Sequence, residues 1–137
     1  MRDGGETFVA IGDNAQVLDG RFQRENGRLT GVVRAPIGAL QDVDGVAFFR
    51  KPQNTLGDSE GLALIDGGYA ISFERDHRVM IYRDGAVPKR VELPRDIQSA
   101  GENGGVEALA VDAMGRLIAI PETRTGRANG FPVWRQT

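Results

Sequence analysis

An internal repeat constrains the fold of this chain more than any other feature of its sequence. One segment reads GDSEGLALIDGGYAISFE, and a later one reads GGVEALAVDAMGRLIAIPE. Glu60 matches Glu107 at a spacing of 47 residues, and Glu74 matches Glu122 at a spacing of 48. A period of about 40–50 residues is typical of the four-stranded blades of β-propellers. The repeat therefore predicts an all-β protein of the propeller type.

A partial third copy, GGETFVAIGD, lies near the start of the chain and ends at Asp13. Asp13 precedes Glu74 by 61 residues, which indicates an insertion in this copy. At the repeat period, 137 residues hold roughly three antiparallel four-stranded blades, whereas a closed propeller needs at least about four. We therefore expect a partial β-propeller that forms a single domain over residues 1–137 and is incomplete at both ends. Because open blade edges recruit partners, we also expect self-association through them.

Turn-forming residues divide the sequence into short strands. The chain has 19 glycines and 6 prolines, which long helices tolerate poorly. Asn26-Gly27 stands between two apolar runs and is a strong β-hairpin signal, because both residues accept positive φ. Residues 35–58 carry several turn residues and are expected to form a long excursion. The expected strands are residues 7–11, 17–22, 29–33, 61–65, 69–73, 79–82, 90–93, 106–111, 117–120 and 133–134.

Composition excludes several classes of function. There are no cysteines, which removes disulfides, thiolate metal sites and a cysteine nucleophile. The formal net charge is −2, and no run of Lys or Arg indicates a nucleic-acid surface. No segment approaches the ~20 apolar residues of a membrane span, and the first residues lack the form of a signal peptide.

Repeat-matched carboxylates are the first candidates for a functional site. Equivalent positions of successive blades lie in a ring around the propeller axis. The acids expected to converge near the channel are Glu60, Glu74, Glu107, Glu122 and Asp13. Such hard oxygen ligands suit calcium, which takes about 6–8 oxygens and, once bound, is able to neutralise a phosphate oxygen and activate water. The alternative is structural: the same acids accept hydrogen bonds from backbone amides and hold the blades in register.

A second candidate is the basic segment SFERDHRV, which contains Arg75, His77 and Arg78. The planar guanidinium of an arginine matches two phosphate oxygens. A histidine is able to donate a proton to a leaving alkoxide near neutral pH. The alternative is a charged connection between two strands of one blade, with Arg75 paired to a carboxylate and His77 solvated.

Two long segments carry a family resemblance. The first reads DSEGLALIDGGYAISFERDHRVMIYRDG and the second NGGVEALAVDAMGRLIAIPE. Together they resemble the phytase-like family of bacterial proteins labelled "esterase-like activity of phytase". The resemblance implies a six-bladed propeller of roughly twice this length, located in the periplasm or secreted. This chain then corresponds to an internal fragment of such a protein, without an export signal.

The resemblance and the candidate residues together define the expected function. They imply a metal-assisted hydrolase acting on a small-molecule phosphate ester, with calcium as the cofactor. The expected catalytic residues are Glu60, Glu107, Arg75 and His77, and the expected metal ligands are Glu60, Glu74, Glu107 and Glu122. The alternative is a non-catalytic propeller that acts as a scaffold or ligand-binding module.

Overall fold

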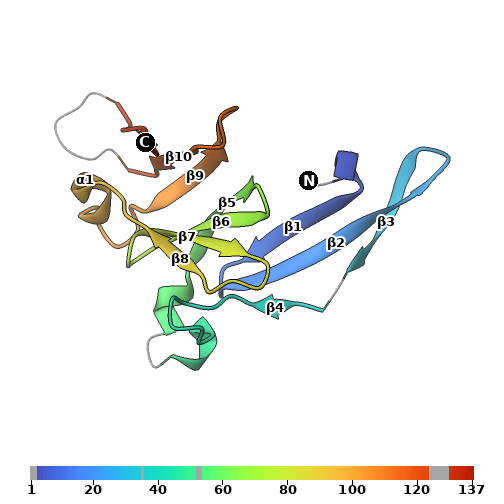
Figure 1. Ribbon diagram of the computed structural model, residues 1–137, viewed down its shortest axis with the longest axis horizontal. Helices are drawn as coiled ribbons and strands as arrows, with labels where there is room; N and C mark the ends of the chain where they lie inside the picture. Colours follow the sequence, from blue (N-terminus) through green and yellow to red (C-terminus); the bar gives the residue numbers. More distant parts are fainter. Residues whose placement is uncertain (1–2, 35, 52–53, 124–129) are drawn as a thin grey trace.

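The computed structural model describes residues 3–34, 36–51, 54–123 and 130–137, and in these ranges the strands form three antiparallel sheets (Figure 1). The N-terminal sheet contains β1 (Thr7–Gly12), β2 (Gln16–Glu25), β3 (Arg28–Arg34) and β4 (Gly38–Ala39). The central sheet contains β5 (Ser59–Ile65), β6 (Gly68–Phe73), β7 (Arg78–Arg83) and β8 (Lys89–Val91). The C-terminal sheet contains β9 (Val106–Val111), β10 (Leu117–Pro121) and β11 (Trp134–Arg135). The short helices are η1 (Asp3–Gly5), η2 (Phe48–Arg50), η3 (Asn54–Gly57) and α1 (Arg95–Gln98).

The central sheet is a complete four-stranded blade in the order β5-β6-β7-β8. Each strand pairs with the next one along the chain. The turns after β5 and β7 contain Gly67 and Gly85, whose φ values of 67° and 69° glycine adopts without steric cost. Most residues of β6 and β7 are buried, because both faces of this sheet are covered. The predicted antiparallel four-stranded blade is confirmed.

The C-terminal sheet repeats this arrangement with three strands among the described residues, in the order β9-β10-β11. Asp112 orders the turn between β9 and β10, because its carboxylate accepts hydrogen bonds from the N–H groups of Met114 and Arg116. The strands predicted at residues 106–111 and 117–120 agree with β9 and β10 to within one residue. No helix in the described ranges is long and apolar enough to cross a bilayer.

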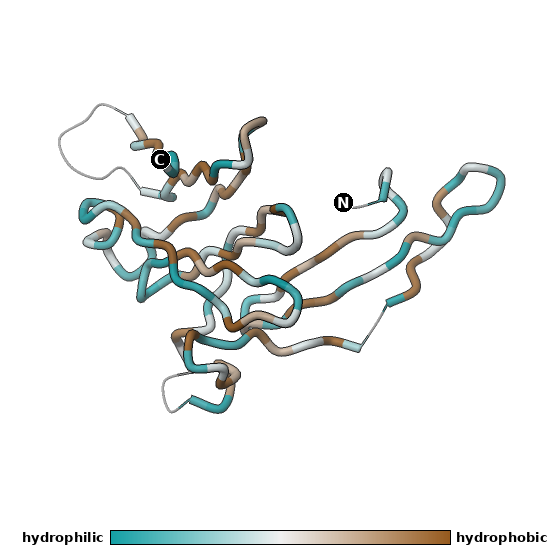
Figure 2. The backbone as a smooth tube through the Cα atoms, in the orientation of Figure 1, coloured by the Kyte–Doolittle hydropathy of each residue, from teal (hydrophilic) through white to brown (hydrophobic). Residues whose placement is uncertain are grey.

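The N-terminal sheet departs from a simple meander. β2 lies between β1 and β3, and its first two residues, Gln16 and Val17, also pair with β4. Asn26 and Gly27 close the β2–β3 hairpin with φ values of 50° and 77°, as the sequence predicts. This hairpin extends away from the other two sheets (Figure 1), and its tip is hydrophilic (Figure 2).

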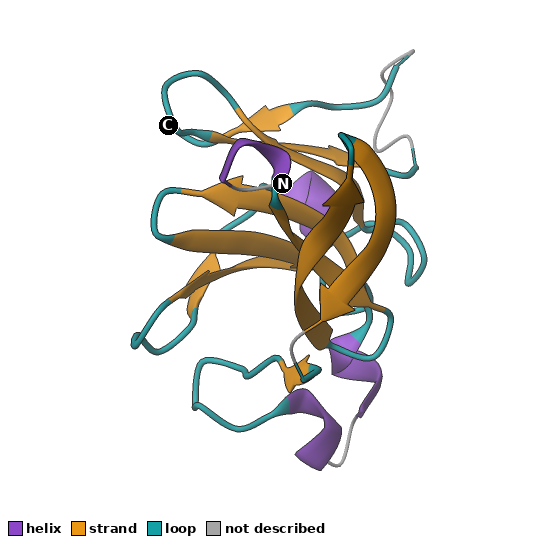
Figure 3. Ribbon diagram, turned by 90° about the vertical axis from the view of Figure 1, so that its right-hand side faces the viewer, coloured by secondary structure: helices purple, strands orange, loops and turns teal. Residues whose placement is uncertain are grey.

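The N-terminal and C-terminal sheets each pack against the central sheet, which is covered on both faces (Figure 3). The core between the central and C-terminal sheets consists of Ala63, Ala70, Val79, Leu93, Ile97, Val106, Leu117 and Ala119. The core on the opposite face consists of Ala15, Leu40, Phe48, Ile71, Phe73, Met80 and Tyr82. Stacking of equivalent antiparallel sheets is the packing mode of a β-propeller. The chain therefore forms part of a propeller.

Two serine hydroxyls fix neighbouring sheets relative to one another. Ser72 on β6 accepts a hydrogen bond from the N–H of Gly61 at 2.8 Å and donates one to the carbonyl of Val106 at 2.7 Å. Ser59 on β5 donates to the carbonyl of Gly12 at the end of β1, at 2.7 Å. Apolar packing has no direction of its own, so these directed bonds set the register between sheets.

The excursion expected at residues 35–58 is packed onto the central sheet where the structure describes it. Phe48 is buried, with its ring centre 5.1 Å from that of Phe73. Lys51 bridges two acids of the same segment, with Nζ 2.7 Å from Asp42 Oδ2 and 2.8 Å from Asp44 Oδ2. Residues 35, 52 and 53 lie outside the described residues.

Candidate functional site

The repeated glutamates occupy the same places in two different sheets. Glu60 is the second residue of β5, and Glu107 is the second residue of β9. Glu74 directly follows β6, and Glu122 directly follows β10. Because paired strands run antiparallel, the start of one strand and the end of the next meet at the same end of a sheet. Each sheet therefore presents two glutamates at one end.

The backbone at this end of the two sheets also repeats. The N–H of Glu74 donates to the carbonyl of Asp58 at 2.9 Å, and the N–H of Glu122 donates to the carbonyl of Gly105 at 2.8 Å. The two acceptors are 47 residues apart, which is the spacing of Glu60 and Glu107. The sequence repeat is therefore also a repeat of the hydrogen bonding.

Five carboxylates meet here in two overlapping groups. The groups are Asp58, Glu60 and Glu74, and Glu74, Glu107 and Glu122. Within each group, one oxygen of every carboxylate lies within 4.8 Å of the others. Glu74 belongs to both groups and is buried. The structure thus brings together all four predicted glutamates. It adds Asp58, which comparison of the repeats missed because a glycine stands at the matching position of the other copy.

Burial and mutual repulsion raise the pKa values of two of these carboxyl groups. Burial raises the pKa of Glu60 to about 7, and the negative charges of Glu107, Glu74 and Asp58 add to the effect. Burial also raises the pKa of Glu74, again with help from the neighbouring carboxylates. Asp13 exerts a smaller repulsion on Glu60 and belongs to neither group. A cation placed among these acids would relieve their repulsion.

The protein supplies little positive charge to this carboxylate cluster. In the described ranges, the side chains of the four repeated glutamates form neither a hydrogen bond nor an ion pair, and only Asp58 is paired, with Arg75. The acid pair of Asp42 and Asp44 differs, because the ammonium of Lys51 lies between its two carboxylates. Lys51 therefore neutralises the pair of Asp42 and Asp44. The cluster around Glu74 has no such internal cation among the described residues and is suited to an external one.

Arg75 lies next to the cluster with an unusual backbone conformation. Its φ of 65° is uncommon for a residue with a side chain, and strained residues of this kind concentrate at functional sites. Its Nε donates to Asp58 Oδ2 at 3.2 Å, and its side chain is 45% exposed. Its two terminal nitrogens make no hydrogen bond to the described residues, so they are accessible to an anion. The phosphate-binding role of Arg75 stays a prediction.

His77 is buried beside the cluster rather than solvated. Its Nε2 lies 2.9 Å from the carbonyl of Gly101 and 3.2 Å from that of Ala100, so Nε2 carries the proton and donates it. Its Nδ1 is buried without a hydrogen-bond partner among the described atoms. A Cβ added to Gly105 would lie 3.0 Å from this Nδ1 and 3.1 Å from Glu74 Cγ. His77 and Glu74 therefore flank Gly105, and the catalytic role of His77 stays a prediction.

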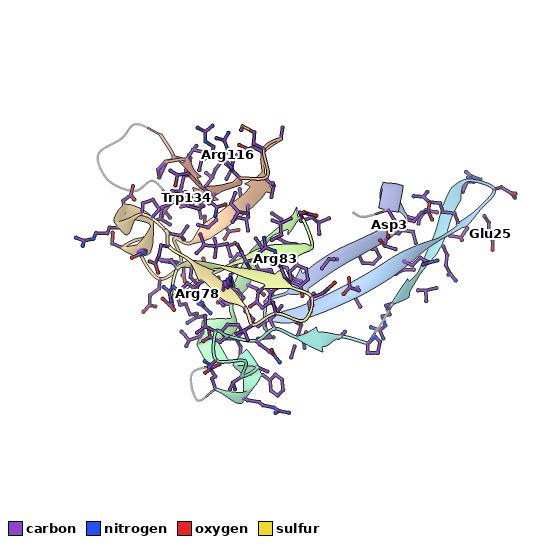
Figure 4. All side chains as sticks on the ribbon, in the orientation of Figure 1. Asp3, Glu25, Arg78, Arg83, Arg116 and Trp134 are labelled. Carbon is purple, nitrogen blue, oxygen red and sulfur yellow. The ribbon has the colours of Figure 1, made fainter. Side chains whose placement is uncertain are left out.

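The side chain of Arg78 is buried against two aromatic rings, so it does not join the exposed Arg75 in the predicted basic cluster. Arg78 is labelled in Figure 4. Its guanidinium carbon lies 4.5 Å from the ring centre of Phe73 and 5.1 Å from that of Phe48. It donates hydrogen bonds to the carbonyls of Leu56 and Asp76. The physical reason is cation–π stacking, which sequence spacing does not reveal. Arg78 attaches the excursion to the central sheet.

The segment Gly57–Gly61 matches the pattern G-x-S-x-G, which sequence reasoning missed. In α/β-hydrolases the serine of this pattern stands on a sharp turn from a strand into a helix, with its hydroxyl exposed. Here Ser59 begins strand β5 and is 4% exposed, with its hydroxyl bonded to the carbonyl of Gly12. Ser59 therefore links two sheets and is not placed as a nucleophile.

Neighbouring antiparallel sheets that share one sequence repeat define a β-propeller-type protein. The acidic residues gathered at one end of two of these sheets form a candidate cation site. The chain belongs to the phytase-like family, because the family model described as "Esterase-like activity of phytase" matches residues 1–132. No curated protein matches the chain. Among solved structures it is similar to apo AztD from Citrobacter koseri, with 16% identity and a TM-score of 0.32. That match covers 93% of this chain and 34% of the AztD chain, so the chain spans about a third of that protein's length.

Proposed function

We propose that this phytase-like chain carries the site of a hydrolase that cleaves small-molecule phosphoric esters with the help of a divalent cation. The observation that supports this is the pair of carboxylate groups joined through Glu74. Exposed acids normally stand apart because they repel one another. A chain that holds five carboxylates together, with the pKa values of Glu60 and Glu74 raised, is arranged to bind positive charge.

The donor atoms fit calcium. All five side chains of the cluster offer carboxylate oxygens, and calcium takes about 6–8 oxygen ligands in a flexible geometry. The residues that would hold it are Asp58, Glu60, Glu74, Glu107 and Glu122. When bound, the ion would supply positive charge that polarises a phosphoryl oxygen and lowers the pKa of water.

The remaining roles belong to two members of the cluster and to two side chains beside it. Arg75, with both terminal nitrogens accessible, would bind two oxygens of the phosphoryl group. Glu60, which stands in the cluster beside Glu74, is the first candidate to accept a proton from the attacking water. Glu107 is exposed in the same cluster and is the second candidate base. His77 is buried against Gly105, so we assign it the positioning of Glu74.

Glu74→Gln tests this proposal, with Glu25→Gln at the exposed end of β2 as the matched control. Calorimetric titration with calcium alone measures binding, and p-nitrophenyl phosphate with calcium or chelator measures hydrolysis. We expect E74Q to weaken calcium binding by at least ~10-fold and to abolish calcium-dependent hydrolysis, since it removes the carboxylate common to both groups. E25Q should change neither quantity. Wild-type calcium affinity in E74Q would refute the proposed site.

A second candidate is a non-catalytic module in which a cation locks two sheets together. It is favoured by the position of the cluster, since Glu60 belongs to the central sheet and Glu107 to the C-terminal sheet. In that case calcium would raise the unfolding temperature, because a ligand that binds only the folded state stabilises it. No hydrolysis of p-nitrophenyl phosphate would then be measured, with or without calcium.

A further inference from the structure

A pocket of about 240 Å³ lies at the end of the central sheet opposite the carboxylate cluster. The cluster lies where β5 begins and β6 ends, whereas the pocket is lined by Tyr69 at the start of β6 and by Tyr82 near the end of β7. The turn after β7 forms one wall of the pocket, and residues 39–41, which begin in β4, form another (Figure 1). The pocket is therefore a second candidate site, separate from the acids.

Two stacked tyrosine rings form the aromatic part of this pocket. Tyr69 and Tyr82 are direct partners across β6 and β7, and their ring centres are 5.5 Å apart with an angle of 26° between the ring planes. Tyr82 is buried, and its hydroxyl donates to the carbonyl of Gln41 at 2.9 Å, which holds residue 41 against the sheet. Tyr69 is only half-buried, so most of the accessible aromatic surface is its own.

Asp84 and Gln41 supply polar side chains at the rim of the pocket. The turn after β7 is closed by a bond of 3.1 Å from the N–H of Ala86 to the carbonyl of Arg83, and Gly85 adopts the φ of 69° that places Asp84 at its tip. Asp84 and Gln41 are both exposed, and within the described residues neither side chain forms a hydrogen bond or an ion pair. A carboxylate only accepts hydrogen bonds, whereas an amide both donates and accepts them.

The charge and shape of the pocket disfavour an anion and an organic cation. Arg83 also lines the pocket, but side chains alternate along a strand, so its guanidinium lies on the face of β7 opposite Tyr82. The carboxylate of Asp84 remains and would repel an anion. An organic cation would leave the amide of Gln41 unused, and recognition by an aromatic cage needs several accessible ring faces. Because Tyr82 is covered, this pocket presents mainly the ring of Tyr69.

A neutral sugar ring matches all of these groups. Its hydroxyls donate to a carboxylate, and they both donate to and accept from an amide. Its C–H groups form a flat apolar face, which packs on an aromatic ring. At about 240 Å³, the pocket is smaller than the ~300–1,000 Å³ of sites for drug-sized ligands, so its size fits a single ring.

We propose that this pocket binds one ring of a neutral carbohydrate. Tyr69 would pack against the face of the sugar ring, and Asp84 and the side-chain amide of Gln41 would bind its hydroxyls. The lining residues include neither Arg75 nor any member of the carboxylate cluster. Binding here requires neither a cation nor hydrolysis, so the inference is independent of the proposed function.

Amide NMR spectra of the whole chain, titrated with sugars in the presence of chelator, test the proposal. The probes are methyl α-glucoside, methyl α-galactoside and methyl α-mannoside, which differ in the direction of single hydroxyls. We expect at least one of them to bind with a dissociation constant of roughly 1–10 mM, in keeping with its small number of atoms. It should shift the amide signals of Gln41, Tyr69 and Gly85, which line the pocket.

Asp84→Ala should weaken this binding by at least ~10-fold, because it removes a hydrogen bond to a charged group. Asp66→Ala is the matched control. Asp66 is also exposed and also precedes a glycine of positive φ, in the turn between β5 and β6, but it does not line the pocket. D66A should therefore bind the sugar as the wild type does.

Three results would overturn the proposal. The first is the absence of signal shifts with all three glycosides at concentrations well above the expected dissociation constant. The second is wild-type affinity in D84A. The third is tighter binding of tetramethylammonium than of every glycoside, which would assign the pocket to an organic cation. Calcium binding and hydrolysis in E74Q report on the carboxylate cluster alone, so failure of the proposed function and failure of this inference give different results.

Discussion

Ser72 and Val106 belong to adjacent sheets and are joined by a hydrogen bond of 2.7 Å from hydroxyl to carbonyl oxygen. The same hydroxyl accepts the N–H of Gly61 at 2.8 Å, so one side chain satisfies a peptide group from each sheet. Ser72 is fully buried, and a buried peptide group left without a partner is costly. This contact therefore specifies how two blades fit together.

Ser72→Ala should lower the free energy of unfolding by about 2–3 kcal/mol, because it leaves the Gly61 N–H and the Val106 carbonyl unpaired. Urea unfolding measures the change. Ser99→Ala is the matched control, since the Ser99 hydroxyl makes an exposed bond of 3.3 Å, and it should stay within ~0.5 kcal/mol of the wild type. Equal effects of the two variants would contradict the inter-sheet role of Ser72.

Gly61→Ala should destabilise the chain by about 1–3 kcal/mol through overpacking. The new Cβ would lie 2.5 Å from Ser72 Oγ and 3.1 Å from the carbonyl oxygen of Glu107, and that backbone oxygen has little freedom to move. Gly101→Ala is the control, because no atom lies within 4 Å of a Cβ at that position. A thermal melt that ranks G101A below G61A in stability would refute the close approach of the two sheets.

Arg78→Lys should cost about 2 kcal/mol although it keeps the charge. Lysine lacks the planar fork that reaches the carbonyls of Leu56 and Asp76, and it stacks less well on Phe73. Equilibrium unfolding in urea measures the change. The exposed Arg83 provides the control, and R83K should be neutral. If R78K melts like the wild type, Arg78 does not attach the excursion to the central sheet.

Glu60→Gln should stabilise the metal-free chain at high pH only. The folded-state pKa of Glu60 is raised from 4.5 to about 7, so folding favours its protonated form and the wild type loses stability as pH rises from 4.5 to about 7. Glutamine removes that loss. With chelator present, E60Q should melt roughly 2–5 °C above the wild type at pH 8. At pH 4 the two melting temperatures should coincide, and a constant difference at both pH values would contradict the raised pKa.

Sequence reasoning located the strands well because their signals are local. Asn26-Gly27, Gly67 and Gly85 have the positive φ values that their turns require, and each lies between two apolar runs. The convergence of the repeated glutamates also followed from sequence, because equal positions in a repeat become equal positions in stacked sheets. Asp58 was missed since it has no acidic counterpart in the second copy.

The sequence failed where contacts join distant segments. Arg78 looked like a neighbour of Arg75, but its side chain stacks between aromatic rings contributed by β6 and by η2, which no spacing rule predicts. The alternative of a solvated His77 was wrong, because the loop carrying Gly101 covers this side chain. The pairing of β4 with the start of β2 was equally hidden, because two residues are too few to show a strand pattern.

The meander of the central sheet has a consequence for folding kinetics. Its pairings β5-β6, β6-β7 and β7-β8 all join neighbours in the chain, whereas β4 returns to the start of β2 across the whole β3 segment. Contacts between close neighbours form fastest, because they close the shortest loops. Because the central sheet combines such local pairings with the most buried strands, β6 and β7, we expect β5–β8 to act as the nucleus onto which the flanking strands condense. Substitutions in β6 would then slow refolding, whereas substitutions at the β2–β3 tip would act on the unfolding rate.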